Sequence, residues 1–302
     1  MIKPDFLKKG DKIGIVSPAG NIDEKPVMDT KSYLELRGFE VVLSQHVLTS
    51  WHQFAGTDEE RAAAFQEMLD DKEIKAILCS RGGYGSIRII DKLNFAQFKK
   101  YPKWIIGYSD ITVFHSYLTN KLNCASIHAI MPKNFSVSMN AKNSMNSLIS
   151  ILQGEIPSYE MINHDLSRPG KAKGKLIGGN LSIIQNLRAT EIDLNYKGNI
   201  LFIEDIGEYL YQVDRMMMNL KFSGVLDKIS GLIVGNFTKI KDGEIPFGAN
   251  AYEIIFEKVK EYKYPVCFGL NAGHELPHLP LIMGSEVTLG IGSKNTVVSF
   301  KI

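Results

Sequence analysis

The sequence predicts an α/β protein whose N-terminal part is built on a mostly parallel sheet with helices on both faces. Within residues 12–130, short apolar runs rich in β-branched residues alternate with segments whose apolar residues recur at helical spacing. A glycine-containing turn or a serine follows several of these strand-like runs. Parallel strands place such turns at one edge of the sheet, where open α/β proteins bind their ligands. We therefore expect a functional site at the carboxyl ends of these strands.

The predicted elements of the N-terminal part follow one another closely. Gly38 marks the end of the first helix, and Thr57 with Glu60 forms the sequence pattern that opens the second. Strands are expected at residues 12–16, 39–43, 74–79, 104–106 and within 124–130, and helices at 27–36, 57–69, 86–90 and 110–118.

Residues 139–173 show little periodicity beyond one short helix near 147–152, and they contain two prolines. We interpret them as a linker between an N-terminal domain at 1–138 and a C-terminal domain at 174–302. The C-terminal strands are expected at 200–203, 231–234 and 266–270, followed by a hairpin of 286–291 and 296–302.

Composition excludes several classes of protein. The net charge is +2, and Lys and Arg are spread along the chain without a polybasic block, so nucleic acid is not an expected partner. The N-terminus is charged and broken by Pro4, and no apolar run reaches the roughly 18 residues of a membrane span. We expect no membrane association and a cytoplasmic location. Cys79, Cys124 and Cys267 form no CxxC pair, which indicates reduced, mostly buried thiols.

Ser109 stands at the most informative position of the chain. An apolar strand ends at Gly107, and the serine follows almost at once, at the start of an amphipathic helix. The free N–H groups of that helix end would stabilise an oxyanion formed beside the hydroxyl, so Ser109 is a candidate nucleophile. The alternative is that Ser109 only caps the helix, because serine is a favoured N-cap residue.

A serine nucleophile needs a base, and the base needs an acceptor that orients it. His274 is the strongest candidate base, because it follows a strand and a glycine-bounded loop that would present its side chain. Glu204 is the candidate acid, delivered to a strand end by the apolar run before it. Its neighbours Asp205 and Glu208 are instead expected to be solvated or to cap a helix. His128 could line the cleft, but a structural role is favoured for it.

Residues 274–278 also match the H-E-x-x-H pattern of zinc peptidases. That chemistry needs His274 and His278 on one face of a helix, with Glu275 beside the metal-bound water. Pro277 lies inside the motif and would break such a helix. The zinc site is therefore the weaker interpretation, and we expect no metal.

The glycine-rich turn at 81–85 lacks the spacing of a phosphate-binding loop. It is either an ordinary tight turn or an oxyanion device, in which Gly82 or Gly83 would offer a backbone N–H opposite that of Asp110.

Seven motifs then occur in a single order. They are Ser17-Pro18-Ala19-Gly20, Arg81-Gly82-Gly83-Tyr84-Gly85, Gly107-Tyr108-Ser109-Asp110, Gly178-Gly179-Asn180-Leu181, Phe202-Ile203-Glu204-Asp205-Ile206-Gly207-Glu208, Tyr211-Gln212-Val213-Asp214-Arg215 and Gly273-His274. In this order the chain resembles the LD-carboxypeptidases, the muramoyltetrapeptide carboxypeptidase family of serine peptidases, over nearly its whole length.

The resemblance implies a doubly wound N-terminal domain that holds the nucleophile and a β-rich C-terminal α/β domain that holds the other two triad members. It implies Ser109 as the nucleophile, Glu204 as the orienting acid and His274 as the base, with the N–H groups of Gly83 and Asp110 facing the oxyanion. It also implies no cofactor and a homodimer.

The implied reaction releases the terminal D-alanine of a murein tetrapeptide through an acyl-enzyme, during peptidoglycan recycling. A second branch of the family resembles the microcin C immunity peptidases, which cleave a peptidyl-nucleotide antibiotic. That branch usually lacks the forms of the 81–85 turn and of the acid motif that this chain carries, so both motifs favour the cell-wall branch. A departure is His278, where many relatives have asparagine. A non-catalytic ligand-binding α/β protein is the remaining alternative.

A carboxypeptidase must also bind the free carboxylate of its substrate, for which an arginine fork is the best partner. Arg81, beside the proposed oxyanion turn, is the first candidate and Arg215 the second. The alternative is that each arginine ties two loops together through backbone carbonyls. The residues do not specify which diamino acid precedes the D-alanine.

Overall fold

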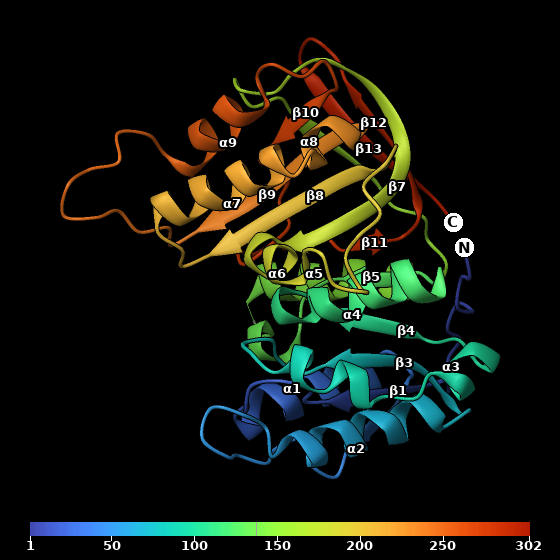
Figure 1. Ribbon diagram of the computed structural model, residues 1–302. Helices are drawn as coiled ribbons and strands as arrows, with labels where there is room; N and C mark the ends of the chain where they lie inside the picture. Colours follow the sequence, from blue (N-terminus) through green and yellow to red (C-terminus); the bar gives the residue numbers. More distant parts are fainter. Residues whose placement is uncertain (137) are drawn as a thin grey trace. The chain divides into compact units, whose positions relative to one another are not determined.

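The computed structural model describes residues 1–136 and 138–302 and divides into two compact units (Figure 1). The N-terminal unit consists of Met1–Glu155 and Leu276–Ile282, and the C-terminal unit of Ile156–Glu275 and Met283–Ile302. Each unit is built around one sheet.

The N-terminal sheet has the strand order β11-β5-β4-β3-β1-β2, and the pairs from β5 to β2 are parallel. Its central strands are almost wholly buried, as expected for a sheet covered on both faces, whereas the edge strand at Glu40–Leu43 is only partly buried. The strands are β1 (Lys12–Val16), β2 (Glu40–Leu43), β3 (Ile74–Cys79), β4 (Trp104–Gly107), β5 (Ser126–His128) and β11 (Leu281–Met283).

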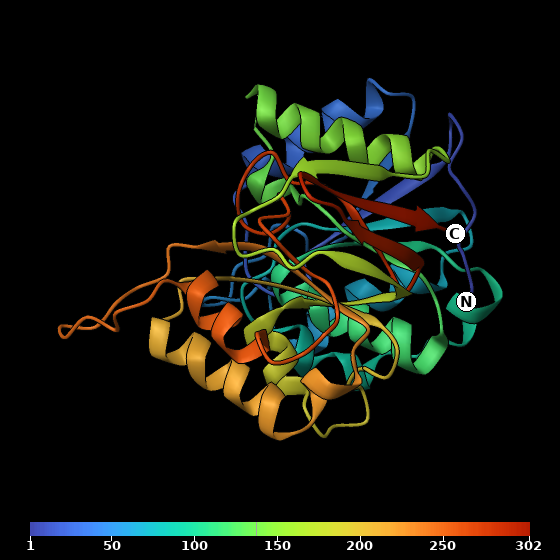
Figure 2. The ribbon, with the colours of Figure 1, turned by 90° about the horizontal axis from the view of Figure 1, so that it is seen from above.

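Helices cover both faces of this sheet. The chain runs from β1 to β2 in one direction and from β2 back to β3 and β4 in the other, so right-handed crossovers put α1 on the face opposite α2 and α4. Phe65 of α2 stacks on Phe114 of α4, and Tyr33 of α1 donates a hydrogen bond to Asn146 of α5. Figure 2 shows α1 and α5 side by side. The helices are α1 (Glu24–Glu35), α2 (Asp58–Asp70), α3 (Ala96–Lys100), α4 (Thr112–Tyr117) and α5 (Met139–Leu152).

The C-terminal sheet is mixed, with the order β10-β9-β8-β7-β12-β13-β6. Strands β7 to β10 are parallel, whereas β12, β13 and β6 continue the sheet in antiparallel pairs. The strands are β6 (Ser158–Ile162), β7 (Gly170–Asn180), β8 (Ile200–Ile206), β9 (Gly231–Thr238), β10 (Val266–Phe268), β12 (Glu286–Ile291) and β13 (Asn295–Lys301). The helices are α6 (Leu181–Leu187), α7 (Leu210–Phe222), α8 (Val225–Lys228) and α9 (Ala251–Val259).

The predicted fold class, a doubly wound N-terminal part with a β-rich α/β C-terminal part, is confirmed. The capping box of Thr57 and Glu60 forms as expected, and the terminal hairpin is β12 and β13. All three cysteines are free and buried. In the described part of the chain, no helix combines the length and the apolar character needed to cross a membrane.

Two predictions of local structure are wrong. Residues 139–173 contain a 14-residue helix and strand pairings, rather than an irregular segment with one short helix. The buried face of α5 is apolar except for Ser144, but Asn and Ser, which are weak helix formers, occupy much of the N-terminal half of this helix. The residues after Gly85 form two short 3₁₀ turns, Ser86–Arg88 and Ile90–Lys92, and no α-helix.

Candidate functional site

Ser109 lies directly after β4 with an unusual backbone conformation. Its φ is +63°, in the left-handed region that a residue with a Cβ rarely adopts. Such strain is kept at sites where a side chain must be aimed, as at the nucleophile turn between a strand and a helix. The N-cap of the short 3₁₀ turn Ser109–Ile111 is Tyr108, and that of α4 is Ile111, and neither cap is made by a serine side chain. The interpretation of Ser109 as a helix cap is therefore wrong.

The glycine-rich turn at residues 81–85, after β3, contacts the turn that contains Ser109 and Asp110. A Cβ added to Gly82 would lie 3.0 Å from Cβ and 3.2 Å from Oγ of Ser109, and 3.2 Å from the backbone nitrogen of Asp110. A Cβ at this position would crowd the neighbouring turn, so the absence of a side chain at Gly82 favours the close approach. Gly83 follows with a φ of +101°. Neither the Gly83 nor the Asp110 N–H donates in the turn and loop hydrogen bonds described for this unit.

In the C-terminal unit, Glu204 and His274 form a hydrogen-bonded pair. Nδ1 of His274 lies 2.7 Å from Oε2 of Glu204, whose side chain is fully buried. If Nδ1–H donates to the carboxylate, the acceptor lone pair of the imidazole is on Nε2. A Cβ on Gly273 would lie 3.1 Å from the same oxygen, so the glycine before His274 permits the approach.

Asp205, the next residue in the sequence, makes different contacts from Glu204. Its Oδ1 accepts from the Asn180 side chain at 2.9 Å, and its Oδ2 accepts from the backbone N–H of Ser182 in the first turn of α6. Burial and the neighbouring Glu204 charge raise the pKa of Asp205 to about 7. Asp205 is thus buried at a helix start and not solvated. Its contacts hold the end of β8, from which Glu204 reaches His274.

Both units match the family that the motifs indicated. The N-terminal domain of the LD-carboxypeptidases matches residues 13–129, and their C-terminal domain matches residues 173–289. The chain belongs to the LD-carboxypeptidase family. It is therefore a carboxypeptidase, a hydrolase of peptide bonds.

Named relatives of this LD-carboxypeptidase fall into two groups. The chain is 31% identical over 300 residues to the probable murein peptide carboxypeptidase of Bacillus subtilis, covering 98% of this chain and 94% of the relative. It is 27% identical to the microcin C7 self-immunity protein MccF of Escherichia coli, over 97% of this chain and 94% of that protein. The muramoyltetrapeptide carboxypeptidase of Oxalobacter formigenes superposes with a TM-score of 0.87 at 27% identity, covering 96% and 99% of the two chains.

The zinc interpretation of residues 274–278 has no geometric support in this LD-carboxypeptidase. The segment is not helical, so His274 and His278 do not share a helix face. His278 is buried in the N-terminal unit, where its backbone N–H donates to Ser144 and its Nε2 lies 3.2 Å from Nδ1 of His128. Its ring also packs edge-on against Tyr108, the residue before Ser109. The rings of His278 and His128 therefore both pack against Tyr108, directly before Ser109.

The two candidate arginines already have contacts. Arg81 donates from Nη1 to the carbonyl oxygen of Asn21 at 2.6 Å and so ties two loops together, as the structural alternative expects. Arg215 is exposed on α7, with its guanidinium 5.2 Å from the ring centre of Tyr211. A carboxylate-binding role for either arginine stays a prediction.

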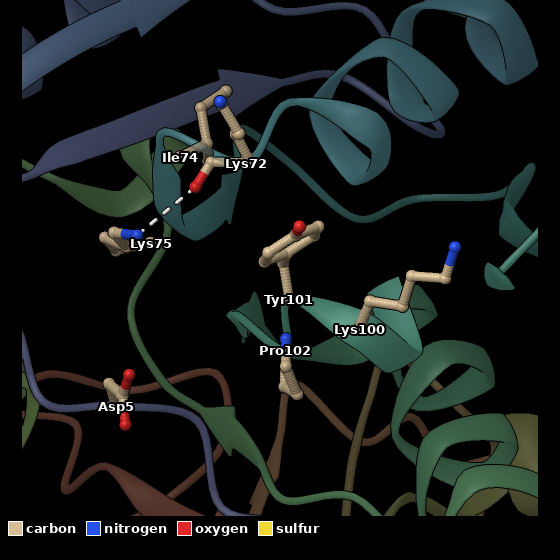
Figure 3. A pocket seen from close by; sticks show the side chains of 7 residues that line it. All are labelled: Asp5, Lys72, Ile74, Lys75, Lys100, Tyr101 and Pro102. Carbon is tan, nitrogen blue, oxygen red and sulfur yellow. Dashed lines mark hydrogen bonds between the residues drawn. The ribbon is translucent and has the colours of Figure 1, made fainter. Parts of the chain in front are cut away.

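One pocket of the N-terminal unit lies away from these residues. It is lined by Asp5, Lys72, Ile74, Lys75, Lys100, Tyr101 and Pro102 (Figure 3). Ile74 begins β3 and Pro102 precedes β4, so the pocket lies at the amino end of these strands, whereas Ser109 follows the carboxyl end. Lys75 donates to the carbonyl of Lys72 inside it. No residue predicted to act in catalysis contributes to this pocket.

Proposed function

We propose that this carboxypeptidase is a serine LD-carboxypeptidase that releases the terminal D-alanine of murein tetrapeptides during peptidoglycan recycling. The observation that carries the proposal is the conformation of Ser109, which lies at the end of β4 in the left-handed region and against a glycine turn. The buried Glu204–His274 pair supplies the matching base and its orienting acid.

In the proposed mechanism, Nε2 of His274 takes the proton of the Ser109 hydroxyl as Oγ attacks the scissile carbonyl carbon. The carbonyl oxygen becomes an oxyanion that accepts from the N–H groups of Gly83 and Asp110. His274 then gives the proton to the departing amine of D-alanine, which leaves an ester of Ser109. Water, deprotonated by His274, hydrolyses this ester. Glu204 holds the required tautomer and stabilises the imidazolium that forms twice in the cycle.

The substrate ends in a carboxylate, and burying an unpaired charge is costly. We assign its recognition to Arg81, with Arg215 as the second candidate. We further propose that the enzyme is a homodimer in the cytoplasm. There it would act on murein tetrapeptides returned from the cell wall. The chain's own form of the 81–85 turn and of the acid motif favours this substrate over a peptidyl-nucleotide antibiotic.

The similarity to the MccF immunity protein makes the antibiotic the competing substrate. One experiment separates the two. The purified protein is given a murein tetrapeptide and, in parallel, an aminoacyl sulfamoyl adenosine, and release of D-alanine or of the amino acid is measured.

We expect D-alanine release by the wild type and a loss of about 10⁴-fold or more in Ser109→Ala. Ser147→Ala is the matched control, because the Ser147 hydroxyl donates to a backbone carbonyl within α5. Hydrolysis of the sulfamoyl adenosine alone would refute the murein substrate. Retention of more than about a tenth of the rate in Ser109→Ala would refute the nucleophile.

A further inference from the structure

The carboxylate of Asp110 links the two turns that meet at the nucleophile. Asp110 follows Ser109, and its side chain is 1% exposed. Its Oδ2 accepts from the backbone N–H of Ser86 at 2.8 Å, across 24 residues of sequence. Ser86 ends the glycine-rich turn that contains Gly82 and Gly83. One residue of the nucleophile turn therefore holds the far end of the glycine-rich turn.

Arg61 of α2 holds the same turn from its other side. Its guanidinium is fully buried, and Nη1 donates to the carbonyl of Gly85 at 3.0 Å and to that of Pro18 at 2.5 Å. A Cβ on Gly85 would lie 2.7 Å from Nη1, so the turn passes directly over the guanidinium. Residues 85 and 86 are thus fixed by two buried side chains of opposite charge.

The charges of these two side chains act on each other. Burial raises the pKa of Asp110, while the charge of Arg61 opposes that rise. Arg61 also forms an ion pair with Asp58, whose carboxylate pairs in turn with Arg88, just beyond the glycine-rich turn. An ionised carboxylate next to a developing oxyanion would oppose it, and a buried arginine close by reduces that opposition.

We propose that the Asp110 side chain is a positioning residue that fixes the glycine-rich turn so that the Gly83 N–H converges with the N–H of Asp110 itself. Arg61 contributes to this arrangement, because its guanidinium holds the carbonyl of Gly85 and partly offsets the charge of Asp110. The inference rests on the proposed serine mechanism, because it concerns the groups that would meet the oxyanion. It gives a structural role to the buried carboxylate of Asp110, which is not part of the proposed triad.

The proposal predicts a specific kinetic pattern. Donors that converge only on the oxyanion stabilise the transition state and not the bound substrate, so their misplacement lowers kcat and leaves KM nearly unchanged. Removing one oxyanion donor costs about 10²–10³ in kcat. We expect a loss of about 10²-fold in Asp110→Ala. Asp110→Asn should stay within about fivefold of the wild type, because its amide oxygen still accepts from Ser86.

The experiment compares Asp110→Asn, Asp110→Ala and Asp110→Leu, the last of which fills the space without an acceptor. Asp58→Asn is the matched control, since it removes the carboxylate that forms the ion pair with Arg61 but is not part of the hydrogen bond between Asp110 and Ser86. Rates of D-alanine release and of Ser109 labelling by a fluorophosphonate are measured for each. The labelling rate depends on the oxyanion donors but not on the identity of the peptide substrate.

The proposal is supported if Asp110→Ala and Asp110→Leu lose labelling and kcat with KM unchanged. Asp110→Asn should then retain both the labelling rate and kcat. Labelling of either variant at the wild-type rate overturns it, as does an Asn variant that is as slow as Ala. If the wild type labels at Ser109 but releases no D-alanine, the substrate assignment fails and the labelling series still tests Asp110. If Asp110→Ala does not fold, the comparison of Leu with Asn decides.

Discussion

Nδ1 of His274 lies 2.7 Å from Oε2 of Glu204, although the two residues are 70 positions apart in the chain. Glu204 reaches this point from the carboxyl end of β8, and His274 from the loop after β10. The carboxylate is fully buried, and its Oε1 has no hydrogen-bond partner among the described residues. The hydrogen bond described for this carboxylate is therefore the one with the imidazole.

Glu204→Gln keeps the shape of the side chain but removes the charge that stabilises an imidazolium and selects its tautomer. We expect kcat for D-alanine release to fall by about 10²–10⁴, with little change in KM. The control is Glu257→Gln, which alters an exposed carboxylate of α9 paired with Lys258. A Glu204→Gln enzyme within tenfold of the wild-type rate would show that Glu204 does not orient the base.

Activity should survive prolonged treatment with EDTA or phenanthroline, because residues 274–278 do not form the helix that a zinc motif requires. In the same assay His274→Ala should be severely impaired, whereas His278→Asn and Glu275→Gln should keep most of the rate. A zinc enzyme would lose activity in all three variants, because Glu275 would be its general base. Similar losses of activity in all three variants, together with zinc in the purified protein, would show that the protein is a zinc enzyme and would refute the serine triad.

A carboxylate clamp would make the enzyme distinguish a free terminal D-alanine from its amide. Arg81→Lys keeps the charge but loses the bidentate fork, so we expect kcat/KM for the free acid to fall by about tenfold and that for the amide to change little. Arg215→Lys tests the second candidate in the same way. If the wild type hydrolyses acid and amide equally, neither arginine binds the carboxylate.

His115 should make the N-terminal unit sensitive to acid. The residue is buried in α4, with Nε2 2.9 Å from the carbonyl oxygen of Gly107 and Nδ1 2.8 Å from the Ser126 hydroxyl. Burial lowers its pKa from 6.5 to about 4. Between these values the unfolded chain binds a proton that the folded unit excludes. The free energy of unfolding should therefore be highest above pH 6.5 and fall as the pH decreases toward 4.

Both tryptophans, Trp51 and Trp104, belong to the N-terminal unit, so their fluorescence reports its unfolding by urea. We expect His115→Gln to lower stability at pH 7 but to flatten the loss between pH 6.5 and 4, because it removes the titrating group. An unchanged slope in the variant would assign the acid sensitivity to other residues.

Several elements could be predicted from the sequence because their signals are local. β1 and β3 form at the expected residues, since continuous apolar runs bounded by turn residues need no distant partner to be recognised. Thr57 and Glu60 form a capping box at the N-terminus of α2. The two residues are three positions apart, so the sequence shows this contact directly. The full length of α5 is not evident from the sequence, because Asn and Ser residues, which are weak helix formers, occupy much of its N-terminal half.

For the candidate site, the sequence by itself predicted which residues would carry the chemistry, and it determined that Ser109 and Glu204 stand at strand ends. Only the tertiary structure decided that Ser109 is strained rather than a cap, that Glu204 and not Asp205 meets His274, and that Asp110 reaches Ser86. The reason is physical. Residue spacing along the chain sets periodicity and turns, whereas a hydrogen bond between residues 24 or 70 positions apart depends on strand order, register and burial, which arise only when the whole unit packs.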